Sequence, residues 1–125
     1  MPTGYMVPPP PVVAPNATVV AKDADATLTV SDFGKIITNT GAAGAVVLTL
    51  PAASTAAGCS IKVQLTVAQI VKCTPATGEK VFLGGSGVAS KYLQLAGVIG
   101  NFCDLYCDGV SYHVMNYSGV ATKEA

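Results

Sequence analysis

The feature that most constrains the fold is a series of short β-type runs, each ended by turn residues. From about Lys22 onward, runs rich in Val, Ile, Leu and Thr recur, and no amphipathic helical pattern interrupts them. In residues 61–67 the odd positions are apolar and the even positions polar, which predicts one buried and one exposed strand face. The series predicts an all-β fold of about eight or nine strands.

The even spacing of these runs is typical of a small antiparallel β-sandwich or a jelly-roll-like body, and a small barrel fits it as well. No internal repeat of about 20 to 50 residues stands out, which counts against a solenoid. Residues 35–39 and 45–50 flank a turn with two glycines, and Pro51 ends the second run, which predicts a hairpin. Asp108-Gly109 predicts a second hairpin, between residues 99–107 and 110–117.

Charge is scarce along the whole chain. Only 11% of the 125 residues are charged and 50% are hydrophobic, whereas soluble domains average roughly 25% charged residues. With no net charge, little keeps a free monomer soluble, so we expect self-association or docking on a large partner. The lysines occur singly and form no basic patch, which argues against nucleic-acid binding.

No segment has the pattern of a membrane anchor or a secretory leader. The apolar runs are shorter than the ~20 residues that a membrane helix needs. The first residues lack the basic region and the apolar core of a signal peptide. We therefore expect that the protein is made in the cytoplasm and does not associate with membranes.

The first twenty residues differ in composition from the rest. Six of the eight prolines lie there, and the run Pro8–Pro11 favours a left-handed polyproline helix without internal hydrogen bonds. A disordered tail is one interpretation. The apolar residues between the prolines favour another, an ordered arm that docks on a neighbour, because a solvated linker would use Ser, Gly or charge. We divide the chain into an arm, residues 1–20, and an all-β domain, residues 21–125. The predicted interface residues of the arm are Tyr5, Met6, Val7, Pro8, Pro9, Pro10, Pro11, Val12 and Val13.

Several motifs carry a resemblance to a known group of proteins. Gly34-Lys35 near a strand start, then Asn39-Thr40-Gly41-Ala42-Ala43-Gly44, then Leu50-Pro51-Ala52-Ala53 form a pattern that resembles small β-rich structural proteins of tailed bacteriophages. These are the head decoration or cement proteins and some tail-fibre modules. Tyr112 occupies a position that is commonly Trp in that pattern, and this chain has no Trp. The resemblance implies a place on the capsid exterior of a virion, a homo-oligomer, by resemblance a trimer, and a major capsid protein as partner.

The four cysteines allow more than one interpretation. Cys103 and Cys107 share one strand face with Leu105, and their backbones lie about 13 Å apart, too far for one disulfide or one zinc ion. Cys59 and Cys73 lie on segments that could be antiparallel neighbours, so a bridge between them stays open. We favour four reduced cysteines that pack as small hydrophobic side chains, and a metal site is the weakest alternative.

The residues that could support catalysis are few. His113 is the only histidine; Ser111 lies on the same strand face, but no motif places a carboxylate beside the imidazole. Asp104 and Asp108 are about 13 Å apart on a strand, beyond the ~9.5 Å of inverting glycosidases. Asp23 and Asp25 fit a solvated loop better than a strand cap or a cation site, and residues 84–87 fit a flexible loop better than a phosphate cradle. We expect no enzymatic activity, no cofactor and no metal.

Together these observations predict a phage virion structural protein that decorates and stabilises the capsid as a symmetric oligomer. The arm would dock on neighbouring subunits or on the major capsid protein. The alternative is a tail-fibre, head-fibre or receptor-binding module, which would contact a host surface through loops such as residues 84–90. An unrelated bacterial adhesin or matrix protein is a third interpretation, weakened by the lack of a signal peptide.

Overall fold

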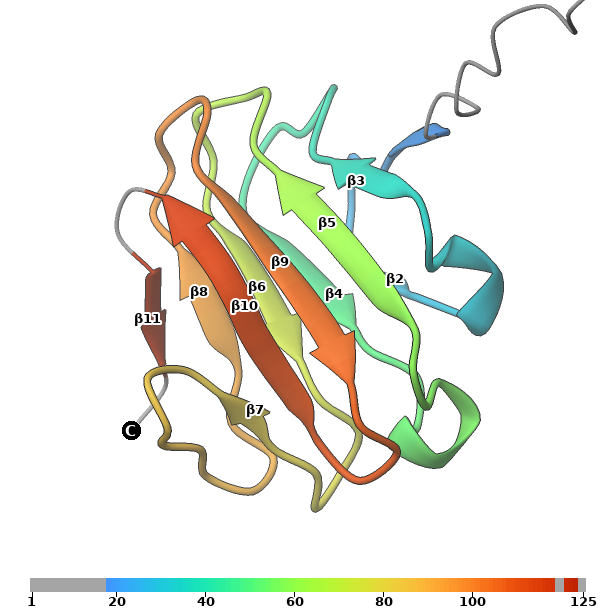
Figure 1. Cartoon of the computed structure of the whole chain (residues 1–125). Helices are drawn as coiled ribbons and strands as arrows, with labels where there is room; N and C mark the ends of the chain where they lie inside the picture. Colours follow the sequence, from blue (N-terminus) through green and yellow to red (C-terminus); the bar gives the residue numbers. More distant parts are fainter. Residues whose placement is uncertain (1–17, 119–120, 124–125) are drawn as a thin grey trace, which may run out of the picture.

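A computed structural model of the chain describes residues 18–118 and 121–123, which form two β-sheets around one core (Figure 1). The predicted all-β class is confirmed, since strands dominate and the helices among these residues are two single-turn 3-10 helices, η1 (Val30–Asp32) and η2 (Ala53–Thr55). The first sheet has six strands in the order β1 (Val19–Ala21), β3 (Ile36–Thr38), β5 (Ser60–Gln64), β9 (Phe102–Cys107), β10 (Tyr112–Ser118) and β7 (Val81–Phe82). The second has five, in the order β11 (Ala121–Lys123), β8 (Leu93–Leu95), β6 (Val71–Thr74), β4 (Val46–Thr49) and β2 (Ala26–Thr27).

Strands β1 to β6 alternate between the two sheets. β1, β3 and β5 are parallel neighbours in the first sheet, while β2, β4 and β6 are parallel neighbours in the second. Residues 19–74 therefore wind as a flat coil, and each winding adds one strand to each sheet. In register, Val19 lies opposite Ile36, and Ile36 lies opposite Lys62. Each parallel connection passes through the facing sheet, where many proteins place a helix.

The predicted hairpin of residues 35–39 and 45–50 is wrong. β3 pairs with β1 and β5, whereas β4 pairs with β2 and β6, so the two strands lie in opposite sheets. The glycine turn crosses from one sheet to the other: Gly41 has a φ of 88°, and the side chain of Ala42 is buried at the edge of the core. This arrangement buries Ile37 and Val46 from opposite sides of the core.

The prediction of an antiparallel body is wrong for five of the nine strand pairs among the described residues. The parallel pairs are β1–β3, β3–β5, β2–β4, β4–β6 and β7–β10. The hairpin predicted around Asp108-Gly109 is confirmed, because β9 and β10 are antiparallel, with Cys107 opposite Tyr112. A bulge at Met115 interrupts this pair between Val114 and Asn116.

Alternate residues of both sheets fill the core. In β5 the predicted alternation is confirmed: Ile61 and Val63 are buried, while Ser60, Lys62 and Gln64 are exposed. Facing strands contribute residues such as Leu48 and Leu93 to the same cluster. Burial of each such side chain contributes about 1.5–3 kcal/mol, so this shared core is the main source of stability.

The chain enters the first sheet through its edge strand. Of the arm predicted at residues 1–20, only residues 18–20 are described, and Val19 and Val20 belong to β1. The N–H of Ile36 donates to the carbonyl of Thr18 over 2.9 Å. Among residues 18–118 and 121–123, no helix has the length and the apolar character needed to cross a bilayer.

Candidate interaction surface

The residues predicted to form the interface lie outside the described part of the chain. They are Tyr5, Met6, Val7, Pro8, Pro9, Pro10, Pro11, Val12 and Val13. The described residues hold three other features that sequence reasoning singled out or missed: the histidine, the Asn39 motif and the outer face of the six-stranded sheet.

His113 is held on three sides. Its ring stacks between Phe82 and Tyr106, with centroid distances of 5.1 and 4.9 Å. Its Nε2 lies 2.7 Å from Oδ2 of Asp108. The sequence prediction that no carboxylate orients this imidazole is therefore wrong. The prediction compared Asp108 only with Asp104, along one strand. The four-residue loop between β9 and β10 instead brings Asp108 beside His113. The register of the predicted hairpin was the signal that could have found this contact.

Asp108 joins this histidine to the hairpin turn. Its Oδ1 accepts the N–H groups of Ser111 and Val110, at 2.7 and 2.8 Å. The Ser111 N–H, the His113 side chain and the Val110 N–H stabilise the charged carboxylate, and they lower the pKa of Asp108 to about 2. Ser111 enters the network through its backbone, so the arrangement fixes the end of the hairpin and ties β7, β9 and β10 together.

Asn39, from the motif that carries the phage resemblance, is a buried crosslink between windings. Its side chain is 1% exposed, and its Oδ1 accepts the N–H groups of Thr66 and Val67 at 2.8 and 3.0 Å. Its Nδ2 donates to the carbonyls of Val67 and Gln69 at 3.0 and 3.3 Å. The motif therefore holds the β5–β6 turn against the end of β3. No local pattern indicates this role, because the partners are about 27 residues away in the sequence.

Two carboxylates make similar links between segments that are distant in the sequence. Asp25 Oδ1 accepts the N–H of Val47 at 2.8 Å, which connects the segment before β2 to β4. Asp25 is an exposed loop residue, as predicted, and its carboxylate also anchors this loop to β4. Both carboxylate oxygens of Glu79 accept the N–H of Ala53, at 2.9 and 3.1 Å.

All four cysteines are free thiols, and Cys73, Cys103 and Cys107 are buried. The prediction that Cys103 and Cys107 share the inner face of one strand is confirmed. Cys59 and Cys73 do not lie on neighbouring antiparallel strands, because Cys59 directly precedes β5 in one sheet and Cys73 lies on β6 in the other. Cys73 instead meets Cys103 across the core, and their hydrogen bond together with burial raises the pKa of Cys103. The described residues contain no group of three His, Cys, Asp or Glu side chains placed to hold a metal ion.

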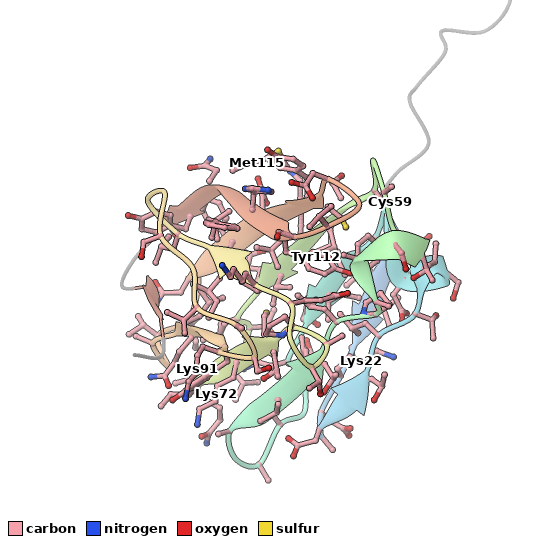
Figure 2. All side chains as sticks on the ribbon, turned by 90° about the horizontal axis from the view of Figure 1, so that it is seen from below. Lys22, Cys59, Lys72, Lys91, Tyr112 and Met115 are labelled. Atoms are coloured by element: carbon pink, nitrogen blue, oxygen red, sulfur yellow. The ribbon has the colours of Figure 1, made fainter. Side chains whose placement is uncertain are left out.

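The outer faces of the two sheets differ in polarity. Among strands whose side chains are described, all the exposed large hydrophobic residues belong to the six-stranded sheet: Val19, Tyr106, Met115 and Tyr117. The outward positions of the five-stranded sheet include Thr49, Lys72, Thr74 and Gln94. In Figure 2, Met115 projects from one side of the molecule and Lys72 from the opposite side, with Tyr112 between them. The outer face of the six-stranded sheet thus combines exposed hydrophobic side chains with polar ones such as Lys62 and Gln64; for brevity we call it the apolar face.

A shallow groove runs along this apolar face. We call it the outer-sheet groove: a depression of about 310 Å³ and an adjoining one of about 100 Å³, which share Ile36 and Lys62. Its walls come from β3, β5, β9 and β10, strands that are far apart in the sequence. The larger part is lined by Ile36, Lys62, Val63, Gln64, Phe102, Asp104 and Asn116, and the smaller part by Gly34, Lys35, Ile36, Ser60, Ile61 and Lys62.

No protein-family model matches this chain, and no curated protein matches it. Its class is therefore described by its fold and surface: an all-β protein of two sheets, whose exposed large hydrophobic strand residues among the described positions lie on one sheet, the one that carries the groove.

Proposed function

We propose that this protein is a structural subunit of a tailed-bacteriophage virion, a head decoration protein that binds the capsid exterior as a homo-oligomer and stabilises it. The observation that carries the proposal is the gathering of exposed hydrophobic strand residues on one sheet of a charge-poor protein. The motif resemblance around Asn39-Thr40-Gly41 supports the assignment to phage structural proteins.

The proposed mechanism is adhesion. The body, which we take to be a β-sandwich, associates through the outer face of its six-stranded sheet, and by the family resemblance the oligomer is a trimer. The N-terminal arm docks on neighbouring subunits or on the major capsid protein. Each arm adds a tethered contact at high effective concentration, so affinity for a symmetric shell rises without any single strong site.

We also propose that the protein is not an enzyme. The support is the environment of its one histidine: two aromatic rings cover the imidazole, and the Asp108 carboxylate beside it is bound to the hairpin turn. The positions of His113 and Asp108 are therefore explained by their role in stabilising the end of the hairpin, without a catalytic role.

The copy number in purified virions tests the proposal. We expect hundreds of copies per particle, because a decoration protein follows the symmetry of the shell. Removal of residues 1–17, which spares β1, should leave the circular dichroism spectrum unchanged and greatly reduce cosedimentation with capsids. Unchanged capsid occupancy of the truncated protein would contradict the role of the arm, and absence of the protein from capsids would contradict the whole proposal.

The second candidate is a tail-fibre, head-fibre or receptor-binding module. The outer-sheet groove favours it, because polar side chains such as Gln64 and Asp104 line an open depression with an aromatic residue, Phe102. Such a module would be present in a handful of copies per virion. The same copy count therefore separates the two candidates.

A further inference from the structure

We propose that the outer-sheet groove binds residues 1–17 of a neighbouring copy of this chain, with the proline run 8–11 lying along β5. The inference deepens the proposed function, since it rests on the self-association of the arm and names the surface that accepts it. Shape, hydrogen-bonding chemistry and charge support it separately.

The groove is long enough to hold the whole proline run. Ser60, Ile61 and Lys62 line one part of the groove and Lys62, Val63 and Gln64 the other, so it follows the whole of β5. A five-residue strand is about 16 Å long at ~3.3 Å per residue. The four residues of the proline run, at ~3.1 Å each in a polyproline helix, span about 12 Å, which this length accommodates.

The groove offers hydrogen-bond donors to a ligand that has only acceptors. A proline run has carbonyl oxygens but no N–H groups, so it cannot extend a sheet and must be bound by side chains. Lys62 and Gln64 are exposed, and among the described residues neither side chain has a hydrogen-bond partner. The side-chain oxygen of Asn116 accepts the N–H of Tyr117. The NH₂ group of the same side chain is therefore the part that can donate to a ligand.

The apolar part of the groove suits proline rings. Ile36 and Phe102 are half-buried and lie on either side of β5. Grooves that bind polyproline segments combine such apolar or aromatic surfaces with a few polar side chains, and they benefit because the ligand is already ordered. Phe102 and Ile36 thus provide ring contacts while Lys62, Gln64 and Asn116 bind carbonyls.

Neither the side chains of residues 1–17 nor those of the larger part of the groove carry a net charge. Residues 1–17 contain no Asp, Glu, Lys or Arg. In the larger part of the groove the charged residues are Lys62 and Asp104, which are direct cross-strand partners. The smaller part adds Lys35. Because the segment itself has no charged side chain, its binding should depend little on salt, unlike binding of an anionic ligand.

The position of β1 explains why the occupant is the arm. Residues 1–17 join the body at Thr18, next to Val19, which lies opposite the groove residue Ile36. The segment therefore leaves from the edge of the same sheet that carries the groove. Exchange of these segments between copies covers the apolar face and links the subunits. Such association is expected of a chain that has too few charges to keep a free monomer soluble.

The test uses the full chain. We expect sedimentation velocity to show a concentration-dependent oligomer, which an excess of synthetic peptide 1–17 dissociates and a peptide with serine at positions 8–11 does not. Gln64→Glu places a carboxylate against the proline carbonyls and should weaken the oligomer at least tenfold. The matched control Gln94→Glu, on the outer face of the five-stranded sheet, should leave the oligomer unchanged.

A mixed sample determines which copy supplies the segment. Isotope-labelled chains are mixed with unlabelled Thr3→Cys/Cys59→Ser chains that carry a spin label at residue 3. We expect broadening of the side-chain amide signals of Gln64 and Asn116, whatever the salt concentration. Signals that stay sharp in the mixture, or that broaden only when label and isotope share one chain, overturn the proposal.

This experiment separates the inference from the proposed function. A groove that fails to bind the peptide, in a protein that is abundant on capsids, rejects the groove as the docking site and leaves the decoration role standing. A groove that binds the peptide, in a protein absent from capsids, rejects the decoration role and supports the inference.

Discussion

The coil of residues 19–74 and the hairpin of residues 102–118 both place an Asx side chain in a turn, but the two side chains act over different ranges. Asn39 bonds to backbone groups 27 to 30 residues away, whereas Asp108 bonds to groups two to five residues away. The local bond accompanies an ordinary hairpin. The long-range bond accompanies parallel strands, whose neighbours are always distant in sequence.

The same kind of turn sequence therefore occurs in two different structural settings. A glycine turn between two β-type runs closes a hairpin at Asp108-Gly109, yet at Gly41 it passes the chain to the facing sheet. What differs is the polar side chain beside the turn and the place of its partners. Removal of these side chains should therefore have unequal consequences in the two regions.

Replacement of Asn39 by alanine should have the largest effect. It removes four hydrogen bonds that the buried amide makes to partly buried backbone groups of residues 66–69, and we expect a loss of about 2 kcal/mol in the free energy of unfolding. Urea denaturation measures it. The control Asn116→Ala removes an exposed amide and should change stability by less than about 0.5 kcal/mol. Equal losses in the two variants would show that the crosslink between windings is not important.

Tyr112→Phe tests the bond between the two regions. The buried Tyr112 hydroxyl donates to the carbonyl of Pro51 at 2.6 Å, which joins the hairpin to the segment after β4. Loss of this hydroxyl should cost about 1 kcal/mol, measured by the same denaturation. Tyr117→Phe, at an exposed site of the same strand, serves as control. A Tyr112→Phe variant as stable as the control would mean that the two regions are joined by the core alone.

Acid should weaken the hairpin end through Asp108. Its folded-state pKa of about 2 lies below the ordinary value of 3.8, so the carboxylate stabilises the fold. That contribution is fully present above about pH 4 and is lost as the pH falls toward 2. Asp108→Asn should remove this part of the pH dependence, measured by urea denaturation between pH 5 and pH 2. Parallel profiles of the two proteins would contradict the assignment. The effect should be the smallest of the three, because Asp108 is exposed.

Local sequence patterns were enough to predict single strands and one turn, but not the order of the strands. The alternation of Ile61 and Val63 follows from strand geometry, and the turn at Asp108-Gly109 follows from residue type. The coil was not predictable, because the interval from Val19 to Ile36 is shorter than that from Ile36 to Lys62, so no fixed repeat appears. The groove was also hidden, since only sheet order brings residues of β3, β5, β9 and β10 together.

The edge position of β1 has a mechanical consequence. A pull on the chain at Thr18 first loads the hydrogen bonds from Ile36 to Thr18 and from Lys22 to Thr38, at 2.9 and 2.8 Å. β1 has three residues and a single neighbouring strand, so it yields before the strands that enclose the core. Release of β1 therefore frees the chain only as far as β2, which stays paired with β4, while β5, β9 and β10 keep their own pairing.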